Sequence, residues 1–203
     1  MRILASIISF LALILIAGCT IIPVGESAQS DLPLLLFNST QVSAIVIEDD
    51  WVGYSPVAPI EAHFRLQKSN DGFDGEAFFS VGGFSTSTLT DTVSIHIPQV
   101  EALQFLDSLA QTPVKKSIYR PAISHTDDYP AITITLKLPD DLVVFHTESQ
   151  GAEHIPWQVT VQGNSYVIYT ADVAHALNAL DPFLARSIQQ DMLDSLWKEF
   201  KKK

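Results

Sequence analysis

The chain has 203 residues, of which 47% are hydrophobic and 17% are charged, so it can form one substantial core and lacks the composition of a disordered protein. Its formal net charge is -11, from 12 basic and 23 acidic residues, and the only run of basic residues stands at the C terminus. Such a field repels phosphate backbones and argues against nucleic-acid binding. The single cysteine excludes an intrachain disulfide.

The N-terminal segment has the features of an export signal. Arg2 supplies a positive charge, and residues 3–16 form an apolar run. As a helix this run reaches only about 21 Å at about 1.5 Å per residue, which is short of the roughly 30 Å hydrocarbon core of a bilayer. A cleaved signal peptide over residues 1–18 is therefore favoured over a permanent membrane span.

The apolar run ends in Ile16-Ala17-Gly18-Cys19, which resembles the lipobox of bacterial lipoproteins. This resemblance implies diacylglycerol on the Cys19 thiol, cleavage just before Cys19, and acyl chains such as palmitate that anchor the protein to a membrane of the cell envelope. Thr20, which is not aspartate, implies delivery to the outer membrane in a cell that has one, and otherwise to the outer face of the cell membrane. Residues 19–33 are predicted to be a tether. The alternatives are a plain signal peptide or an N-terminal anchor with an incidental cysteine.

The chain that follows is dominated by strand patterns. Residues 42–51 are rich in β-branched side chains, and residues 60–67 alternate with Ala62, Phe64 and Leu66 on one side. Further strands are predicted at residues 76–83, 91–98, 131–138 and 142–149, and in a hairpin over residues 157–170 that turns at Gly163-Asn164.

Three helices are predicted by apolar residues at helical spacing. The first lies between Pro98 and Pro113, the second covers residues 171–180, and the last begins with Asp181 as its N-cap and Pro182 at its first position. No regular alternation of strands and helices appears. Residues 34–203 are therefore predicted to form a single α+β domain, an antiparallel sheet built from hairpins with two to three helices packed on one face.

A cluster of polar residues is expected at one end of the hairpin formed by residues 131–138 and 142–149. A turn at residues 139–141 would place Ile134 opposite His146 and Ile132 opposite Glu148, and would bring the flanking loops together. The cluster contains His125, Asp127, Asp128, Glu148, Glu153 and His154. Imidazoles and carboxylates bind zinc, manganese or iron and can also serve as acid and base in hydrolysis.

A simpler interpretation of this cluster is favoured. Asp127 or Asp128 can cap the turn before Pro130, and the charges can line a solvated sheet edge. No HExxH motif, paired cysteines or phosphate loop occurs in the sequence, so neither a catalytic residue nor a cofactor is predicted. Trp51, Tyr54 and Trp157 stand at strand ends, where they can form an aromatic platform for a ligand or cap the core.

Residues 120–184 carry a second resemblance. The stretches HTDDYPAITITL and FHTESQG resemble a group of uncharacterised small bacterial domains, which implies a domain family but no activity. The amphipathic segment 182–200 is a candidate contact for an envelope protein. The sequence thus predicts a non-catalytic, lipid-anchored, extracytoplasmic binding or envelope-interaction module, with a metal-binding protein or metal-dependent hydrolase that uses the polar cluster as the alternative.

Overall fold

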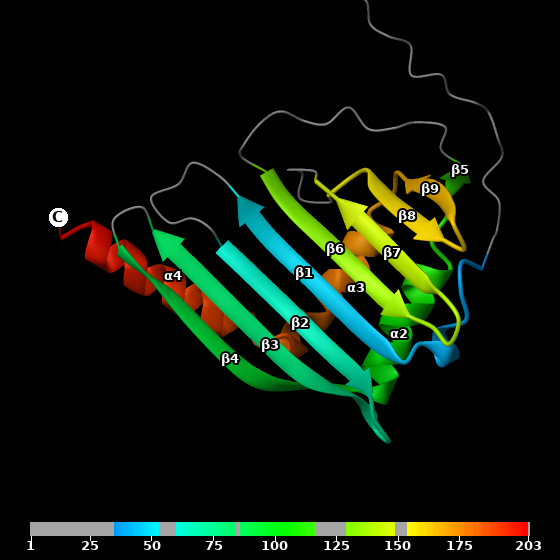
Figure 1. Ribbon diagram of the computed structural model, residues 1–203, viewed down its shortest axis with the longest axis horizontal. Coiled ribbons are helices and arrows are strands. Elements are labelled where there is room, and N and C mark those ends of the chain that lie inside the picture. The colour runs from blue at the N-terminus through cyan, green and yellow to red at the C-terminus, as the bar shows by residue number, and fades with distance from the viewer. Residues whose placement is uncertain (1–34, 53–59, 84–85, 117–128, 149–153, 203) are drawn as a thin grey trace, which may run out of the picture.

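The computed structural model describes residues 35–52, 60–83, 86–116, 129–148 and 154–202 (Figure 1). They form nine strands, three α-helices and two short 3-10 helices. In chain order these are η1 (Ser39–Gln41), β1 (Ala44–Val52), β2 (Ile60–Lys68), β3 (Gly72–Gly83), β4 (Thr86–Pro98), α2 (Gln99–Ala110), β5 (Lys115–Lys116), β6 (Tyr129–Lys137), β7 (Leu142–Thr147), β8 (Trp157–Val161), β9 (Asn164–Ile168), α3 (Asp172–Leu180), η2 (Asp181–Phe183) and α4 (Arg186–Phe200).

All nine strands belong to one antiparallel sheet in the order β4-β3-β2-β1-β6-β7-β8-β9-β5 (Figure 1). The strands β1 to β4 lie on one side of the sheet and β6 to β9 on the other, and β1 pairs with β6 between them. Each group of four strands is followed by a helix, α2 after β4 and α3 after β9. The fold therefore has two topologically similar halves, residues 44–110 and residues 129–180, joined by one strand pair.

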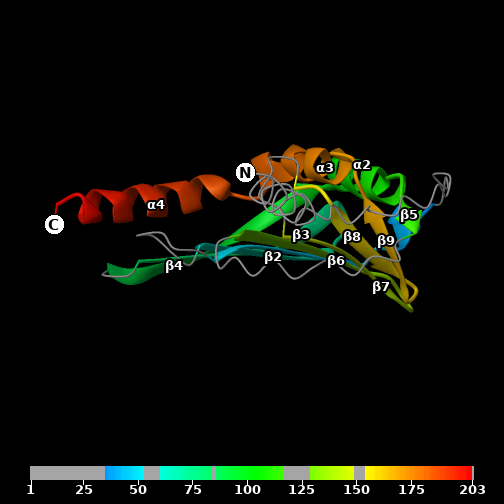
Figure 2. The ribbon, with the colours of Figure 1, turned by 90° about the horizontal axis from the view of Figure 1, so that it is seen from above.

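The helices lie on one face of the sheet, and α2 packs against α3 (Figure 2). Most of the strand side chains that point toward the helices are apolar, and Ala62, Phe64 and Leu66 of β2 are fully buried. Phe105 and Leu106 of α2 join the same core. The predicted α+β class, an antiparallel sheet with helices packed on one face, is thus confirmed. In the part of the chain that the structure describes, none of the helices has the length and hydrophobicity needed to cross a bilayer.

The register of the β6–β7 hairpin differs from the predicted one by one residue. The Leu138 N–H donates a hydrogen bond to the Asp141 carbonyl oxygen at 2.9 Å, so the turn contains only Pro139 and Asp140. Ile134 consequently faces Phe145, and His146 faces Thr133. The predicted pairing of Ile134 with His146 is wrong because a three-residue turn would rotate one strand's apolar side chains out of the core.

The last helix begins later than predicted. Asp181 starts the short 3-10 turn η2, and Ala185 then adopts a left-handed conformation with φ 52° before α4 begins at Arg186. Arg186 fixes this corner, because its Nη1 lies 2.7 Å from Asp49 Oδ2 and its Nε lies 3.0 Å from Asp181 Oδ1. The guanidinium also stacks 5.2 Å from the centre of the Phe64 ring. These contacts position α4 above β3 and β4.

We predict that Phe64→Ala lowers the free energy of unfolding by about 3–5 kcal/mol, because the fully buried ring packs edge-to-face on Phe79 and supports Arg186. Chemical denaturation followed by circular dichroism measures this loss. Leu142→Ala is the control: Leu142 is 50% exposed, so its truncation should change stability by no more than about 0.5 kcal/mol. Similar losses for both variants would contradict the assigned core.

Candidate functional site

The sheet surface opposite the helices, which we call the open face, is polar. It is formed by the residues of β1–β4 and β6–β8 that alternate with core residues, and no described element of the chain packs on it (Figure 2). Its ionisable residues are Glu48, Asp50, Glu61, His63, Arg65, Asp74, Glu76, His96, Lys137, His146 and Glu148. Carboxylates thus outnumber lysine and arginine on this surface, and the histidines lie among them.

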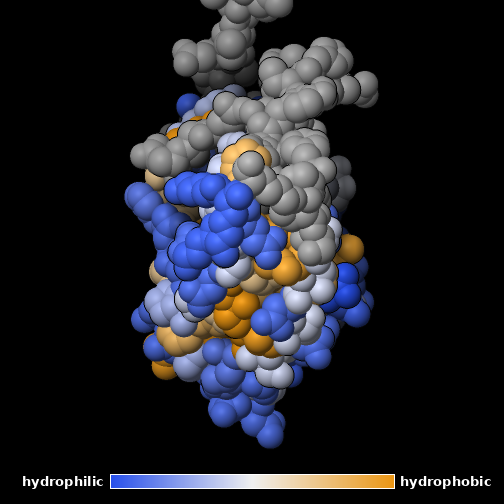
Figure 3. Space-filling view, turned by 90° about the vertical axis from the view of Figure 1, so that its left-hand side faces the viewer, coloured by the Kyte–Doolittle hydropathy of each residue, from blue (hydrophilic) through white to orange (hydrophobic). Residues whose placement is uncertain are grey.

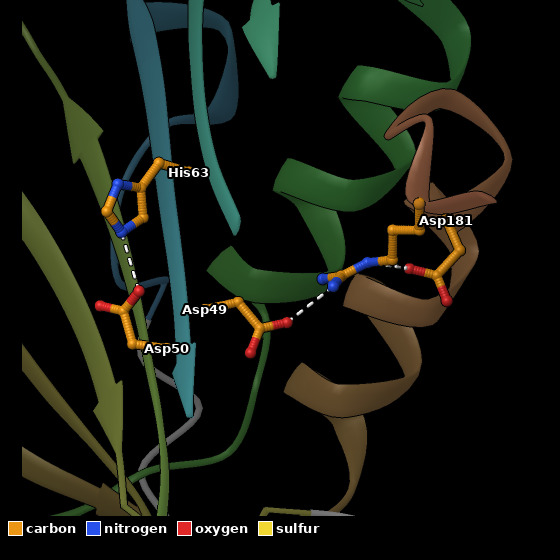
Figure 4. Close-up of polar contacts among 5 residues, drawn as sticks. Asp49, Asp50, His63 and Asp181 are labelled. Carbon is orange, nitrogen blue, oxygen red and sulfur yellow. Dashed lines mark hydrogen bonds and ion pairs between the residues drawn. The ribbon is translucent and has the colours of Figure 1, made fainter. Parts of the chain in front are cut away.

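Asp50 and His63 form a half-buried pair on the open face. His63 Nε2 lies 2.8 Å from Asp50 Oδ1, with the side chains 26% and 34% exposed respectively. Figure 4 shows these two side chains turned toward each other. The neighbouring Asp49 points to the opposite face of the sheet, toward the guanidinium of Arg186. The His63 ring also lies near the Phe78 ring, with ring centres 6.0 Å apart. The imidazole is therefore held in a fixed orientation by a carboxylate and an aromatic ring.

A second histidine occupies the equivalent position in the other half of the sheet. Glu48 and Thr133 face each other at the middle of the β1–β6 pair, and an antiparallel pair has a local two-fold axis at its centre. His63 lies opposite Glu48 on β2, and His146 lies opposite Thr133 on β7. The four residues form one cross-strand row, with about 14 Å between the outer strands at about 4.8 Å per strand. This spacing is too wide for both imidazoles to bind one metal ion.

Hydrogen-bonding groups on two sides also hold His146. Its Nδ1 lies 3.0 Å from Thr133 Oγ1, and its Nε2 lies 3.5 Å from Glu148 Oε1. Each half of the open face thus presents a histidine paired with a carboxylate.

Like charges face each other next to this row. Asp50 is directly opposite Glu61 across the β1–β2 pair, and such a pairing is destabilising by itself. His63 provides a hydrogen-bonding partner for the Asp50 carboxylate. Arg65 is opposite Glu76 on the next pair of strands. The net result is a surface whose negative charge is concentrated around the end of β1.

A third histidine–carboxylate pair lies at the edge of the open face. His96 Nδ1 lies 2.6 Å from Asp74 Oδ1 across the β3–β4 pair, and hydrogen bonds from His96 and Ser69 hold the pKa of Asp74 below its ordinary value of 3.8. Asp71 lies close enough that potential ligand atoms of the three residues are within 4.8 Å of one another. All three residues are exposed, and the Asp74 carboxylate is already hydrogen-bonded to His96. We assign no ligand to this group.

The structure describes only some of the residues in the predicted polar cluster. Glu148 lies on the open face beside His146, as described above, and the His154 ring lies edge-on to the Trp157 ring with centres 6.4 Å apart. The cluster members outside the described residues are His125, Asp127, Asp128 and Glu153, as are Cys19 and Tyr54. The described residues therefore give the metal-dependent alternative no supporting observation.

The predicted aromatic residues have different environments. Trp51 is 38% exposed at the end of β1, whereas Trp157 is fully buried and belongs to the core. Trp157 thus has no surface with which to form a platform. The pairs of His63 and His96 with their carboxylates were not predicted from the sequence, because each joins two strands and becomes visible only once the β1–β2 and β3–β4 registers are known.

Comparison of the chain with protein-family models, with curated proteins and with solved structures finds no match in any of the three. Its function must therefore be argued from its own residues.

We predict that His96→Ala raises the pKa of Asp74 toward 3.8, because the variant removes the hydrogen bond that contributes most to the depression. A depressed folded-state pKa contributes stability above the unfolded value, and this contribution disappears as the pH falls through the folded value. Carboxyl carbon NMR titration measures the pKa directly. His63→Ala, on another strand, should leave the Asp74 titration unchanged, and an unchanged Asp74 pKa in His96→Ala would refute the assigned hydrogen bond.

Proposed function

We propose that this protein is a bacterial lipoprotein, anchored on the extracytoplasmic side of the envelope through Cys19, whose open face binds a positively charged partner such as a basic protein segment. The observation that carries the proposal is the excess of carboxylates on a broad surface without a described covering element. The binding role requires no chemistry beyond charge and hydrogen bonding.

The anchor is supported by the order of features at the N terminus. A positive residue, an apolar run too short to span a bilayer, two small residues and the single cysteine of the chain follow one another in residues 2–19. One acyl chain gives only marginal membrane binding, and several give a stable anchor. A lipidated Cys19 would thus hold the folded part at the membrane surface.

The open face is suited to binding because its charged groups are spread over rigid strands. Single exposed ion pairs contribute little to affinity, but the summed field of several carboxylates attracts a cationic partner and speeds its association. The paired orientations of His63 and His146 add directional hydrogen-bonding groups within this field. Half-buried Glu48 lies between the two histidines in the same row, so a partner's cation could approach the centre of the sheet.

We predict that Cys19→Ser abolishes the mass increment from lipid, because serine lacks the thiol that would be alkylated. Intact-mass measurement of the protein extracted from membranes gives the result, and Thr20→Ala serves as the matched control that keeps the lipid. Lipid of the same mass on the Cys19→Ser chain would refute the anchor.

We predict that the variant Glu48→Gln/Asp50→Asn/Glu61→Gln weakens binding of a decalysine peptide at low salt by about tenfold, because exposed charge pairs contribute up to about 1 kcal/mol each and part of this is lost to screening. Fluorescence anisotropy of a labelled peptide measures the affinity. The control variant Glu101→Gln/Asp107→Asn/Asp172→Asn changes the net charge equally but lies on α2 and α3. Equal weakening by both variants would show that overall charge, and not the open face, binds the peptide.

A further inference from the structure

The C-terminal end of α4 has an exposed aromatic pair that the core does not explain. Met192 and Leu196 are buried against the rest of the protein, but Trp197 is 38% exposed and Phe200 is 42% exposed. The two rings pack edge-to-face with centres 5.8 Å apart. They therefore form a small apolar surface on the last turn of the helix, which we call the α4 tip.

Positive charge is concentrated at the same place. Lys198, Lys201 and Lys202 surround the aromatic pair in sequence, and Lys203 follows them, so four of the 12 basic residues lie in the last six positions of a chain with net charge -11. Among the described residues, no carboxylate lies within ion-pair distance of Lys198, Lys201 or Lys202. Lysines also suit the negative end of a helix dipole, but that effect does not account for the exposed rings beside them.

The α4 tip lies at one end of the molecule. Figures 1 and 2 show α4 running outward over β3 and β4, with its C terminus on the opposite side of the molecule from the start of the described chain. Figure 3 views the molecule from this end and shows hydrophilic and hydrophobic surface side by side. A combination of aromatic rings and lysines is typical of protein surfaces that rest at the headgroup level of a membrane.

We propose that the α4 tip is a second membrane contact, which binds an anionic phospholipid surface through its lysines and inserts Trp197 and Phe200 at headgroup level. This inference rests on the proposed lipid anchor, which places the protein next to such a surface. The 16 residue-to-residue steps from Cys19 to Leu35 span at most about 55 Å when extended, so the anchor leaves the far end of the molecule free to reach the bilayer. Charge complementarity favours a lipid surface over a protein partner for this basic tip.

The contact would also orient the protein. Because α4 belongs to the helix layer, contact through its tip leaves the open face accessible (Figure 2). The anchor and the tip would then hold the protein at two points on the membrane, and the acidic open face would remain available for its partner.

The test uses the lipidated full chain with an environment-sensitive fluorophore on Glu199→Cys. Cys19 is the only native cysteine and is blocked by lipid, so the label is unique. The control label stands on Asp140→Cys, in the β6–β7 turn. Both proteins are reconstituted on vesicles of phosphatidylcholine, with and without phosphatidylglycerol, and flotation reports anchoring independently of the label.

We expect the Glu199→Cys label to shift its emission to the blue on phosphatidylglycerol vesicles only, and the Asp140→Cys label not to respond. In the Glu199→Cys protein, the further substitutions Lys198→Gln/Lys201→Gln/Lys202→Gln should weaken the affinity of the α4 tip for the anionic surface by about 100-fold. Each lysine near an anionic surface contributes a factor of about five to that affinity. Lys115→Gln/Lys116→Gln/Lys137→Gln removes the same charge from strands β5 and β6 and should have little effect.

The outcomes separate the two proposals. A protein that floats but whose Glu199→Cys label does not respond, or responds equally on neutral vesicles, overturns the α4 tip contact and leaves the anchor standing. A protein that is recovered from cell membranes without the lipid mass increment overturns the anchor, and a response of its label on anionic vesicles would still support the tip. A label that responds only when soluble envelope proteins are added overturns the lipid contact in favour of a protein partner.

Discussion

The antiparallel pairing of β1 with β6 is the interaction on which the rest of the structure depends. It joins two halves that each consist of four strands and a helix, and its register over residues 44–52 and 129–137 sets the position of every other strand. A shift of one residue would turn Ile45 and Ile47 out of the core and Glu48 and Asp50 into it, which is prohibitively costly for unpaired carboxylates. The same register aligns His63, Glu48, Thr133 and His146 in one row.

The two faces of the sheet consequently have different roles. The helices α2 and α3 pack on one face and complete the core, and α4 is held there by Arg186, which binds Asp49 on β1. The neighbouring residue Asp50 points to the open face and pairs with His63 (Figure 4). One dipeptide thus contributes one carboxylate to the stability of the helix layer and another to the polar surface. Stability and the proposed recognition therefore rest on opposite sides of the same strands.

The local sequence pattern predicted the strands and helices, whereas the β6–β7 register and the start of α4 depend on tertiary contacts. The alternation of Ala62, Phe64 and Leu66 identified a half-buried strand, and Pro98 and Pro113 bounded the first helix closely. The β6–β7 register could not be predicted, because both two- and three-residue turns fit the stretch around Pro139. The start of α4 depends on the left-handed Ala185 and on Arg186 reaching Asp49, a contact between residues far apart in the chain. The histidine–carboxylate pairs required strand registers for the same reason, and Trp157 became a core residue once β8 joined the sheet.

The central claim is that the open face, aligned by the β1–β6 pair, is the recognition surface. Paramagnetic broadening tests it most directly: a decalysine peptide with a terminal spin label is added to the isotope-labelled protein, and the amide signals are followed. The account predicts the strongest broadening at Glu48, His63 and Thr133 and little at α2 and α3, with the effect lost at high salt. Broadening centred on the helix layer, or spread evenly over the surface, would contradict it.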